Sequence, residues 1–243
     1  MSRSYGPLSR CANRPLSFPL WTTRRRARRL LTVLGVPNRD RQAERRAATR
    51  REIIDAAWDV AREQGLAQLT LRDVAERVGM KAPSLYSHVD SKNAIYDAMF
   101  AQAWTECREV MMAMEDRCPP DVRGALQLYG RTFFDFSVSD LTRFQLMNQR
   151  TIPGFEPSPE SYAPAVSVLG ALRDRLARHA ITAQEDIDLY VALVGGLADA
   201  QLANDPGGDR WARLLDRAID MYLHDLGIET EVPLTSTQEG APP

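Results

Sequence analysis

A chain of 243 residues, 44% hydrophobic and 26% charged, is long enough for one or two compact domains, and its three cysteines lack the spacing of a disulfide framework or a zinc ribbon. The odd number of cysteines fits a reducing compartment, so we expect a cytoplasmic protein, and no apolar stretch approaches the roughly 20 residues of a membrane helix, so we expect no membrane partner. The net charge of −1 is the sum of a basic N-terminal part and an acidic remainder. Residues 1–51 hold 14 arginines and two acids, while the remainder holds 17 bases and 30 acids. This pattern is typical of a nucleic-acid binder with a separate second domain.

Residues 1–38 are rich in arginine and contain four prolines without a sustained helical period. We therefore expect a basic, disordered extension that is not part of the fold. Two interpretations of this segment stay open at this point. It is either an arm that follows DNA phosphates, or sequence translated from a start codon upstream of the native one.

Helical spacing begins at Arg39, and the sequence predicts four helices before residue 115. The first ends at Gly65, and the second runs from the N-cap Thr70 to Gly79. Pro83 lies in the first turn of a third helix of similar length, through Val89. A fourth, longer helix starts at Asp90 or Ser91 and continues toward Met114.

Five further helices are expected after Pro119 and Pro120, and no strand is expected. Their predicted ranges are Asp121 to Phe136, Asp140 to Arg150, Pro159 to Ala180, Ala183 to Asn204 and Asp209 to Leu226. The chain is thus predicted to be all-α with about nine helices. We divide it into the extension 1–38, a helix-turn-helix domain 39–91, a second helical domain 92–228 and a disordered tail 229–243.

Two short helices joined by a turn that contains glycine form a helix-turn-helix, whose second helix enters the major groove of DNA. That spacing alone is a weak signal. Here it is accompanied by a denser pattern of residues: Gly65, Thr70-Leu71-Arg72, Val74-Ala75, Val78-Gly79-Met80, Ala82-Pro83-Ser84-Leu85-Tyr86, His88-Val89 and Lys92. Over about residues 45 to 100, this pattern resembles the DNA-binding signature of the tetracycline-repressor (TetR) family.

The candidate DNA-binding residues are Thr70, Arg72, Lys81, Ala82, Pro83, Ser84, Tyr86, Ser87, His88 and Lys92. The set from Lys81 to Ser84, with Ser87 and His88, forms the predicted edge that reads bases, since small and hydroxyl side chains approach base edges closely. The resemblance implies that Tyr86 and Lys92 hold phosphates and that Arg72 reaches the operator.

Three of these assignments have alternatives. Thr70 either caps its helix alone or also contacts a phosphate. Tyr86 is either a phosphate ligand or a core aromatic residue. Where Ser87 stands, the tetracycline repressor has a larger aromatic residue, so its operator sequence does not transfer to this chain.

The family resemblance also implies a homodimer through the last two helices. The helix from Ala183 has two apolar or small faces, one for its own domain and one for a partner. The predicted interface residues are Leu189, Leu193, Gly196, Ala200, Leu215, Ile219 and Tyr222. The alternative is an ordinary helix pair inside a monomer, although a symmetric operator with two half-sites requires two reading heads.

Aromatic and thioether side chains of the second domain are candidates for an apolar ligand pocket. They are Trp104, Met111, Phe133, Phe144, Met147, Phe155, Tyr162 and Tyr190. Each of them has an alternative as plain core.

We therefore expect a homodimeric repressor that binds a palindromic double-stranded operator and is released by a small, largely apolar effector. A ligand-independent DNA-binding protein and an all-helical enzyme are the alternatives. No nucleophile with its base, no phosphate loop and no His or Cys pair with metal spacing is present in the sequence. We predict no catalytic residue, no metal and no cofactor.

Overall fold

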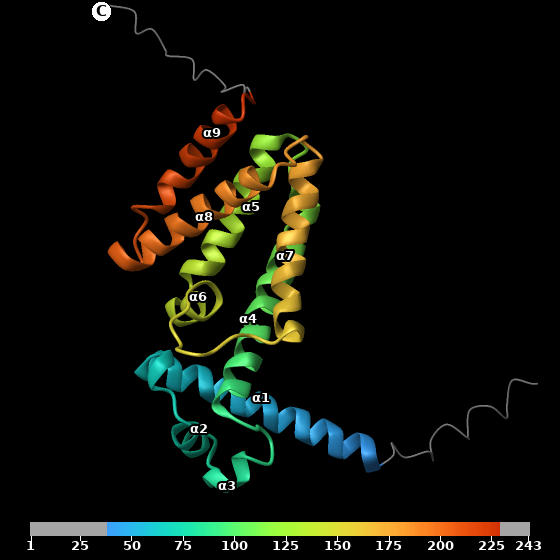
Figure 1. Ribbon diagram of the computed structural model, residues 1–243, viewed down its shortest axis with the longest axis vertical. Helices are drawn as coiled ribbons and strands as arrows, with labels where there is room; N and C mark the ends of the chain where they lie inside the picture. The colour runs from blue at the N-terminus through green and yellow to red at the C-terminus, as the bar shows by residue number, and fades with distance from the viewer. Residues whose placement is uncertain (1–37, 229–243) are drawn as a thin grey trace, which may run out of the picture. The chain divides into compact units, whose positions relative to one another are not determined.

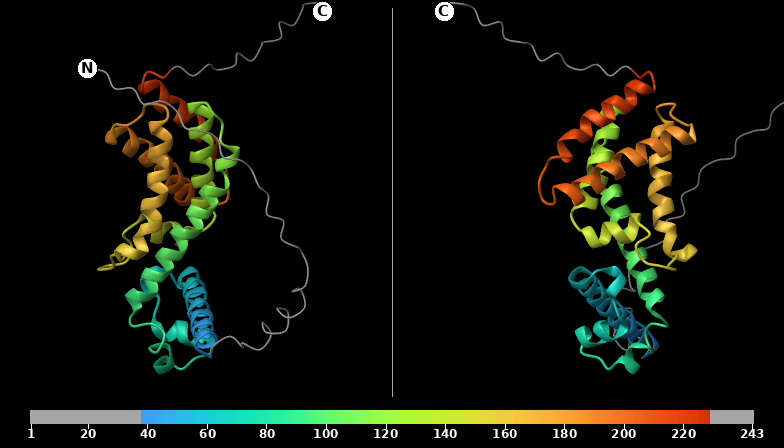
Figure 2. Two further views of the ribbon diagram at one scale, coloured as in Figure 1. Left: turned by 90° about the vertical axis from the view of Figure 1, so that its right-hand side faces the viewer. Right: turned by 60° about the vertical axis from the view of Figure 1, so that its left-hand side comes forward.

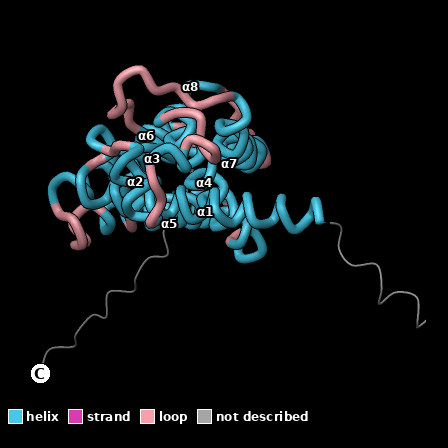
Figure 3. The backbone as a smooth tube through the Cα atoms, turned by 90° about the horizontal axis from the view of Figure 1, so that it is seen from below, coloured by secondary structure: helices cyan, strands magenta, loops and turns pink. Residues whose placement is uncertain are grey.

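The computed structural model describes residues 38–228, and this part of the chain contains nine α-helices and three short 3-10 turns. Figures 1 and 3 show these helices joined by loops. No strand occurs in these residues, which confirms the predicted all-α class. The chain divides into two compact units, Met1–Arg45 and Arg46–Pro243, and every contact discussed below lies in the second. The predictions for residues 1–37 and 229–243 lie outside the described residues.

The first helices follow the local signals of the sequence closely. Helix α1, Asn38–Gln64, ends before Gly65, whose φ of 89° few other residues adopt. Helix α2, Leu71–Val78, lies between the N-cap Thr70 and Gly79, which closes the helix in the left-handed conformation at φ 73°. The caps and the glycine stops predicted here are confirmed.

Helix α3, Ala82–Leu85, is shorter than expected. The predicted third helix reached Val89, but after Leu85 the chain continues as a turn. The carbonyl of Ser84 accepts from the backbone N–H of Ser87 at 3.2 Å and from its hydroxyl at 2.7 Å, while the N–H of Val89 still donates to the Leu85 carbonyl at 3.1 Å. A serine that bonds the backbone of its own turn in this way competes with regular helical bonding.

The remaining helices are α4 (Lys92–Ala113), α5 (Val122–Val138), α6 (Leu141–Asn148), α7 (Pro159–Ala177), α8 (Gln184–Asn204) and α9 (Leu215–Asp225). Helix α4 packs along α7, and α5 packs against both α8 and α9 (Figures 1 and 2). A side-chain oxygen of Ser91, Asp121, Asp140 or Ser158 accepts the backbone N–H three residues later at the starts of α4 to α7. These caps fix where the four helices begin.

The last helix starts six residues later than predicted. Residues 212–214 form a 3-10 turn, and α9 begins at Leu215 instead of Asp209. Gln201 of α8 holds the segment before α9, because its Oε1 accepts the backbone N–H groups of Trp211 and Ala212 at 2.9 and 3.2 Å. Such N–H groups at the start of a helical segment have no acceptor within the helix, so these bonds join the start of this segment to α8.

One hydrophobic core extends through the described helices of the second unit. Helix α4 contributes to it along its length, from Ile95 near its start to Met111 near its end. Near the start of α4, the Tyr96 hydroxyl donates to the Leu66 carbonyl, at 2.5 Å, and so joins α4 to the turn before α2. Among the described residues, no helix combines the length and the apolar character required to cross a membrane.

Candidate functional site

Helix α3 presents polar and small residues outward from a buried anchor. Leu85 is fully buried and Val89 nearly so, which fixes the short helix and the following turn on the core. The side chains around this anchor are accessible. Lys81, Pro83, Ser84, Tyr86 and Ser87 are exposed, and Ala82 and His88 are half-buried. The residues predicted to read DNA therefore surround one short element that is anchored in the core.

Tyr86 has 56% of its surface exposed, which makes it one of the more exposed large apolar residues among those described. The alternative of a core aromatic residue is therefore wrong. A phenol on the surface beside a candidate reading helix has its hydroxyl free to donate to a phosphate oxygen.

The Thr70 hydroxyl caps helix α2 both as a hydrogen-bond acceptor and as a donor. The backbone N–H of Asp73 donates to Thr70 Oγ1 at 3.2 Å, and the hydroxyl donates to the Asp73 carboxylate at 2.6 Å. The capping role is thus observed, and the hydroxyl proton is already used. A phosphate contact by the Thr70 side chain stays a prediction.

Replacing Thr70 by Ala should lower the free energy of unfolding by about 1 kcal/mol, because the cap bond to Asp73 is lost. Thr70→Ser keeps the hydroxyl and should lose much less. Chemical denaturation of the two variants measures the difference. Equal losses for Ala and Ser would show that the methyl group, and not the cap, stabilises this turn.

Two arginines on α2 have different surroundings. Arg77 pairs with Glu63 at 2.5 Å, and that bond lowers the pKa of the Glu63 carboxyl. Arg72 is exposed in the first turn of α2, and among the described residues no acidic group lies within ion-pair distance of it. A cation at a helix N-terminus is disfavoured by the helix dipole, so Arg72 is the arginine with a free charge for an external anion.

Lys92, the first residue of α4, is held in place by its neighbours. Its Nζ donates to the Ala67 carbonyl at 3.1 Å and lies 5.4 Å from the centre of the Tyr96 ring. An ammonium group has three donors, so this contact orients the side chain and leaves donors for a further acceptor.

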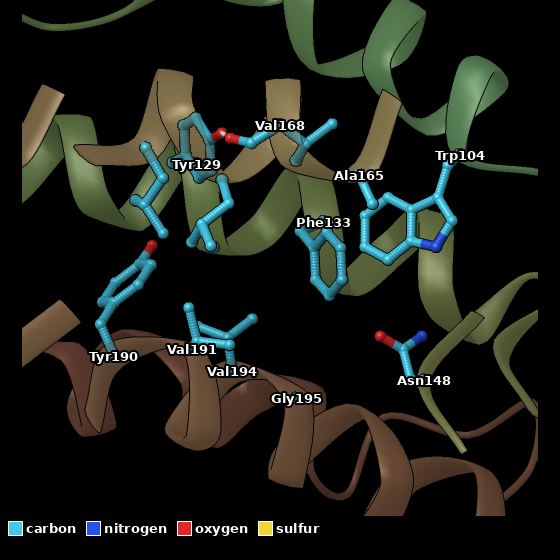
Figure 4. A pocket seen from close by; sticks show the side chains of 13 residues that line it. Trp104, Tyr129, Phe133, Asn148, Ala165, Val168, Tyr190, Val191, Val194 and Gly195 are labelled. Carbon is cyan, nitrogen blue, oxygen red and sulfur yellow. Dashed lines mark hydrogen bonds between the residues drawn. The ribbon is translucent and has the colours of Figure 1, made fainter. Parts of the chain in front are cut away.

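The residues predicted to bind a ligand do not form one site. A cavity of about 130 Å³ is lined by Trp104, Phe133 and Tyr190 of that set (Figure 4). Three others, Met147, Phe155 and Tyr162, line a separate hollow of about 440 Å³, and Met111 lines a third of about 220 Å³. Phe144 is buried in the core, lines none of these hollows and is corrected to a core residue.

The cavity of about 130 Å³ lies among α4, α5, α7 and α8, with a contribution from the last residue of α6. The sequence prediction missed most of its lining: Tyr129, Gly130, Asn148, Ala165, Val168, Leu169, Leu172, Val191, Val194 and Gly195. Tyr129 and Phe133 are four residues apart on one helix face, a signal that could have joined them. No spacing in the sequence indicates that Asn148 lies here.

Both tyrosine hydroxyls of the cavity are bonded to backbone. Tyr129 donates to the Val168 carbonyl at 3.0 Å, and Tyr190 donates to the Leu126 carbonyl at 2.7 Å. Burial raises the pKa of each phenol above its usual value. Both side chains are therefore neutral at physiological pH and present aromatic carbon to the cavity.

The predicted dimer residues fall into two groups. On α8, Leu189 and Gly196 are exposed, and Leu193 and Ala200 are half-buried, so this face is open to a partner. On α9 the prediction was wrong, and the three residues concerned are Leu215, Ile219 and Tyr222.

Those three side chains are buried inside a single chain because α9 packs its apolar stripe on α5 and α8. The Tyr222 hydroxyl donates to the Asp186 carbonyl of α8 at 3.1 Å. The large apolar residue that α9 exposes is Met221, with 62% of its surface accessible.

Within the part of the chain that the structure describes, no three His, Cys, Asp or Glu side chains are grouped closely enough to hold a metal ion. This finding concerns residues 38–228 only.

Comparison with known proteins gives matches at two scales. Residues 53–99 match the model of the family described as bacterial regulatory proteins, tetR family. The class D tetracycline repressor of Escherichia coli is 42% identical over 50 residues, which are 21% of this chain and 23% of the repressor. The chain thus spans about a quarter of the length of that relative.

Two solved structures share the fold over most of their length. The regulatory protein SCO4313 is 20% identical, with a TM-score of 0.63 over 75% of this chain and 98% of that one. The regulator FadR of Bacillus subtilis, in complex with stearoyl-CoA, is 17% identical, with a TM-score of 0.56 over 70% of this chain and 96% of that one. At these identities the likeness concerns the fold alone.

Proposed function

The chain belongs, through residues 53–99, to the tetR family of bacterial regulatory proteins, and from that premise we propose a sequence-specific regulator of transcription. It binds a palindromic operator as a homodimer, and a small molecule releases it. The observation that carries this proposal is the exposed set on α3, because a short helix anchored by the buried Leu85 presents small and hydroxyl side chains outward. Such a regulator acts where the chromosome lies, so we place it in the cytoplasm.

The DNA contacts divide by their chemistry. Tyr86 and Lys92 flank α3 with a phenol and an ammonium group, and both suit phosphate oxygens. Lys81 and Ser84 carry groups that suit base edges. Arg72 adds an unpaired positive charge at the start of α2. In this assignment Tyr86 and Lys92 supply affinity, and Lys81 and Ser84 supply base preference.

The same unit contains a route from the cavity to the DNA-binding helices. Helix α6 carries Asn148 at its cavity end and follows its N-cap Asp140, which pairs with Arg62 of α1 at 2.9 Å. Helix α4 places Trp104 in the cavity and Lys92 against the 3-10 turn before α2, where Lys92 Nζ donates to the Ala67 carbonyl at 3.1 Å. A ligand that moves either helix changes the separation of the two reading heads, which must be about 34 to 36 Å for adjacent major grooves.

The division of contacts is tested on the duplex that the purified protein selects from a random pool. Lys92→Ala should weaken binding to that duplex and to its point variants by similar factors, and should lower the slope of log affinity against log salt by about one. Ser84→Ala should change which point variants are preferred. Arg217→Ala, which removes one positive charge from an exposed position on α9, is the matched control.

Unchanged affinity and unchanged salt slope for Lys92→Ala would remove the phosphate assignment. An unchanged order of preference for Ser84→Ala would remove Ser84 from the reading edge.

A further inference from the structure

The cavity among α4, α5, α7 and α8 is polar at one end only. Figure 4 shows the indole nitrogen of Trp104 and the amide of Asn148 at one end, and the rings of Tyr129 and Tyr190 at the other. These four side chains carry the side-chain nitrogen and oxygen atoms of the lining. The chemistry of an occupant therefore depends on what each of them has left to offer.

Trp104 offers an unused donor. Its Nε1 is buried and finds no hydrogen-bond partner among the described residues. A buried donor without an acceptor destabilises the folded chain, because the donor has lost its bonds to water without replacing them. By contrast, the indole nitrogen of Trp58 donates to Gln102 at 3.2 Å. An occupant with an acceptor beside Trp104 Nε1 would recover that cost.

Asn148 offers an acceptor. Its Nδ2 donates to the Phe144 carbonyl at 3.2 Å, and this bond fixes the orientation of the amide. Asn148 is exposed, and its oxygen, Oδ1, which accepts no hydrogen bond from a described residue, lies on the side of Phe133 in Figure 4. The polar end thus combines one donor and one acceptor.

The other end of the cavity, at Tyr129 and Tyr190, offers neither a free donor nor a free acceptor. The hydroxyls of Tyr129 and Tyr190 are consumed by backbone carbonyls, and the rest of the lining is apolar side chains and two glycines. This part of the cavity suits hydrocarbon or an aromatic ring.

Charge and size restrict the occupant further. None of the 13 lining residues carries a charge, so an ion would lose its hydration without a counter-charge. The volume of about 130 Å³ is close to that of the engineered cavity, on the order of 150 Å³, that binds benzene.

We propose that this cavity binds a small neutral molecule, about the size of a single ring, whose one polar group is a hydroxyl. The hydroxyl oxygen accepts from Trp104 Nε1, and its proton goes to Asn148 Oδ1. Asn148 is exposed and also lines the larger neighbouring hollow, so the hydroxyl lies at the open end of the cavity and the apolar part of the molecule lies inside. This inference rests on the proposed function, in which a ligand binds these helices.

Four ring-sized probes test it on the full-length protein. Phenol can accept and donate, anisole can only accept, toluene can do neither, and benzoate is charged at pH 7. Calorimetry should give phenol an affinity about tenfold above toluene, with anisole between them, because each of the two hydrogen bonds adds about threefold in affinity. Benzoate should bind too weakly to measure.

Two variants assign the selectivity to its atoms. Trp104→Phe keeps an aromatic ring and removes the donor, so phenol and anisole should both fall toward toluene while toluene is unchanged. Asn148→Ala removes the acceptor and should weaken phenol but not anisole. Trp58→Phe, a buried tryptophan outside the cavity, is the matched control and should bind all four probes like the wild type.

A site-specific signal accompanies the affinities. The indole N–H resonance that Trp104→Phe removes should shift downfield with phenol and anisole, and much less with toluene. Equal binding of phenol and toluene, tighter binding of benzoate, or no binding of any probe would overturn the proposed ligand class. Operator binding is measured on the same samples, so loss of DNA recognition would count against the proposed function and not against this cavity chemistry.

Discussion

Replacing Ile219 by Ala should lower the free energy of unfolding of the chain by about 2 to 5 kcal/mol. Ile219 is fully buried, and its Cδ1 would lie 3.0 Å from a Cβ atom added at Gly130 of α5. Removing its three outer carbons leaves a cavity where α9 packs on α5, and the loss combines transfer and cavity costs. Chemical denaturation measures the effect.

The same variant separates a core residue from an interface residue. Met221→Ala, two residues away and exposed, is the matched control and should change stability by less than about 0.5 kcal/mol. The Ile219 loss should persist when the chain is made monomeric by a second change. A monomeric background in which Ile219→Ala has no effect would mean that the side chain acts across a dimer interface after all.

Gly196→Asp should dissociate the proposed dimer and reduce operator affinity by about a hundredfold or more. Gly196 is exposed on α8, on the face that also carries Leu189, Leu193 and Ala200, and a Cβ atom added there meets no atom within 4 Å. The single chain therefore tolerates the side chain, whereas a dimer interface would bury an unpaired charge at a cost of several kcal/mol. A monomer presents one helix-turn-helix to the operator instead of two.

Two controls isolate the cause of that effect. Gly196→Ala tests the added methyl group without the charge, and Gly170→Asp places the same charge on α7, where a Cβ atom also meets nothing within 4 Å. Both should remain dimeric. Mass by sedimentation and operator affinity are measured together, and a Gly196→Asp dimer with full affinity would place the interface elsewhere.

The sequence is most informative where structure depends on local chemistry. Thr70, Gly65 and Gly79 mark helix ends through a hydroxyl cap and through glycine conformations, and such signals need no tertiary context. Helix α3 departs from its prediction because Ser87 bonds the carbonyl of Ser84. The spacing of apolar residues in the sequence does not reveal that this bond competes with helical bonding.

The errors on α9 have a different origin. An apolar stripe such as Leu215, Ile219 and Tyr222 has the same spacing whether it faces the chain's own core or a second chain. Only the packing of α9 on α5 and α8 decides between the two. The exposed Met221 lies on the other side of the same helix.

The cavity was only partly predictable for a related reason. Aromatic composition suggests that a pocket exists, but its walls come from five helices whose approach depends on long-range packing. Asn148 is polar, stands at a helix end and belongs to no apolar pattern. Its role as the acceptor at the cavity's polar end follows from its bond to the Phe144 carbonyl, which only the structure contains.

The central proposal, a dimer that reads DNA through α3, is tested most directly by selecting binding sites for the full-length protein from random duplex DNA. The expected product is a palindrome whose half-sites lie about one helical turn apart, or a small multiple of it, bound by an even number of protomers. Ser84→Ala should change the selected half-site at defined positions. Selection of no common sequence, or of a single asymmetric half-site bound by one protomer, would contradict it.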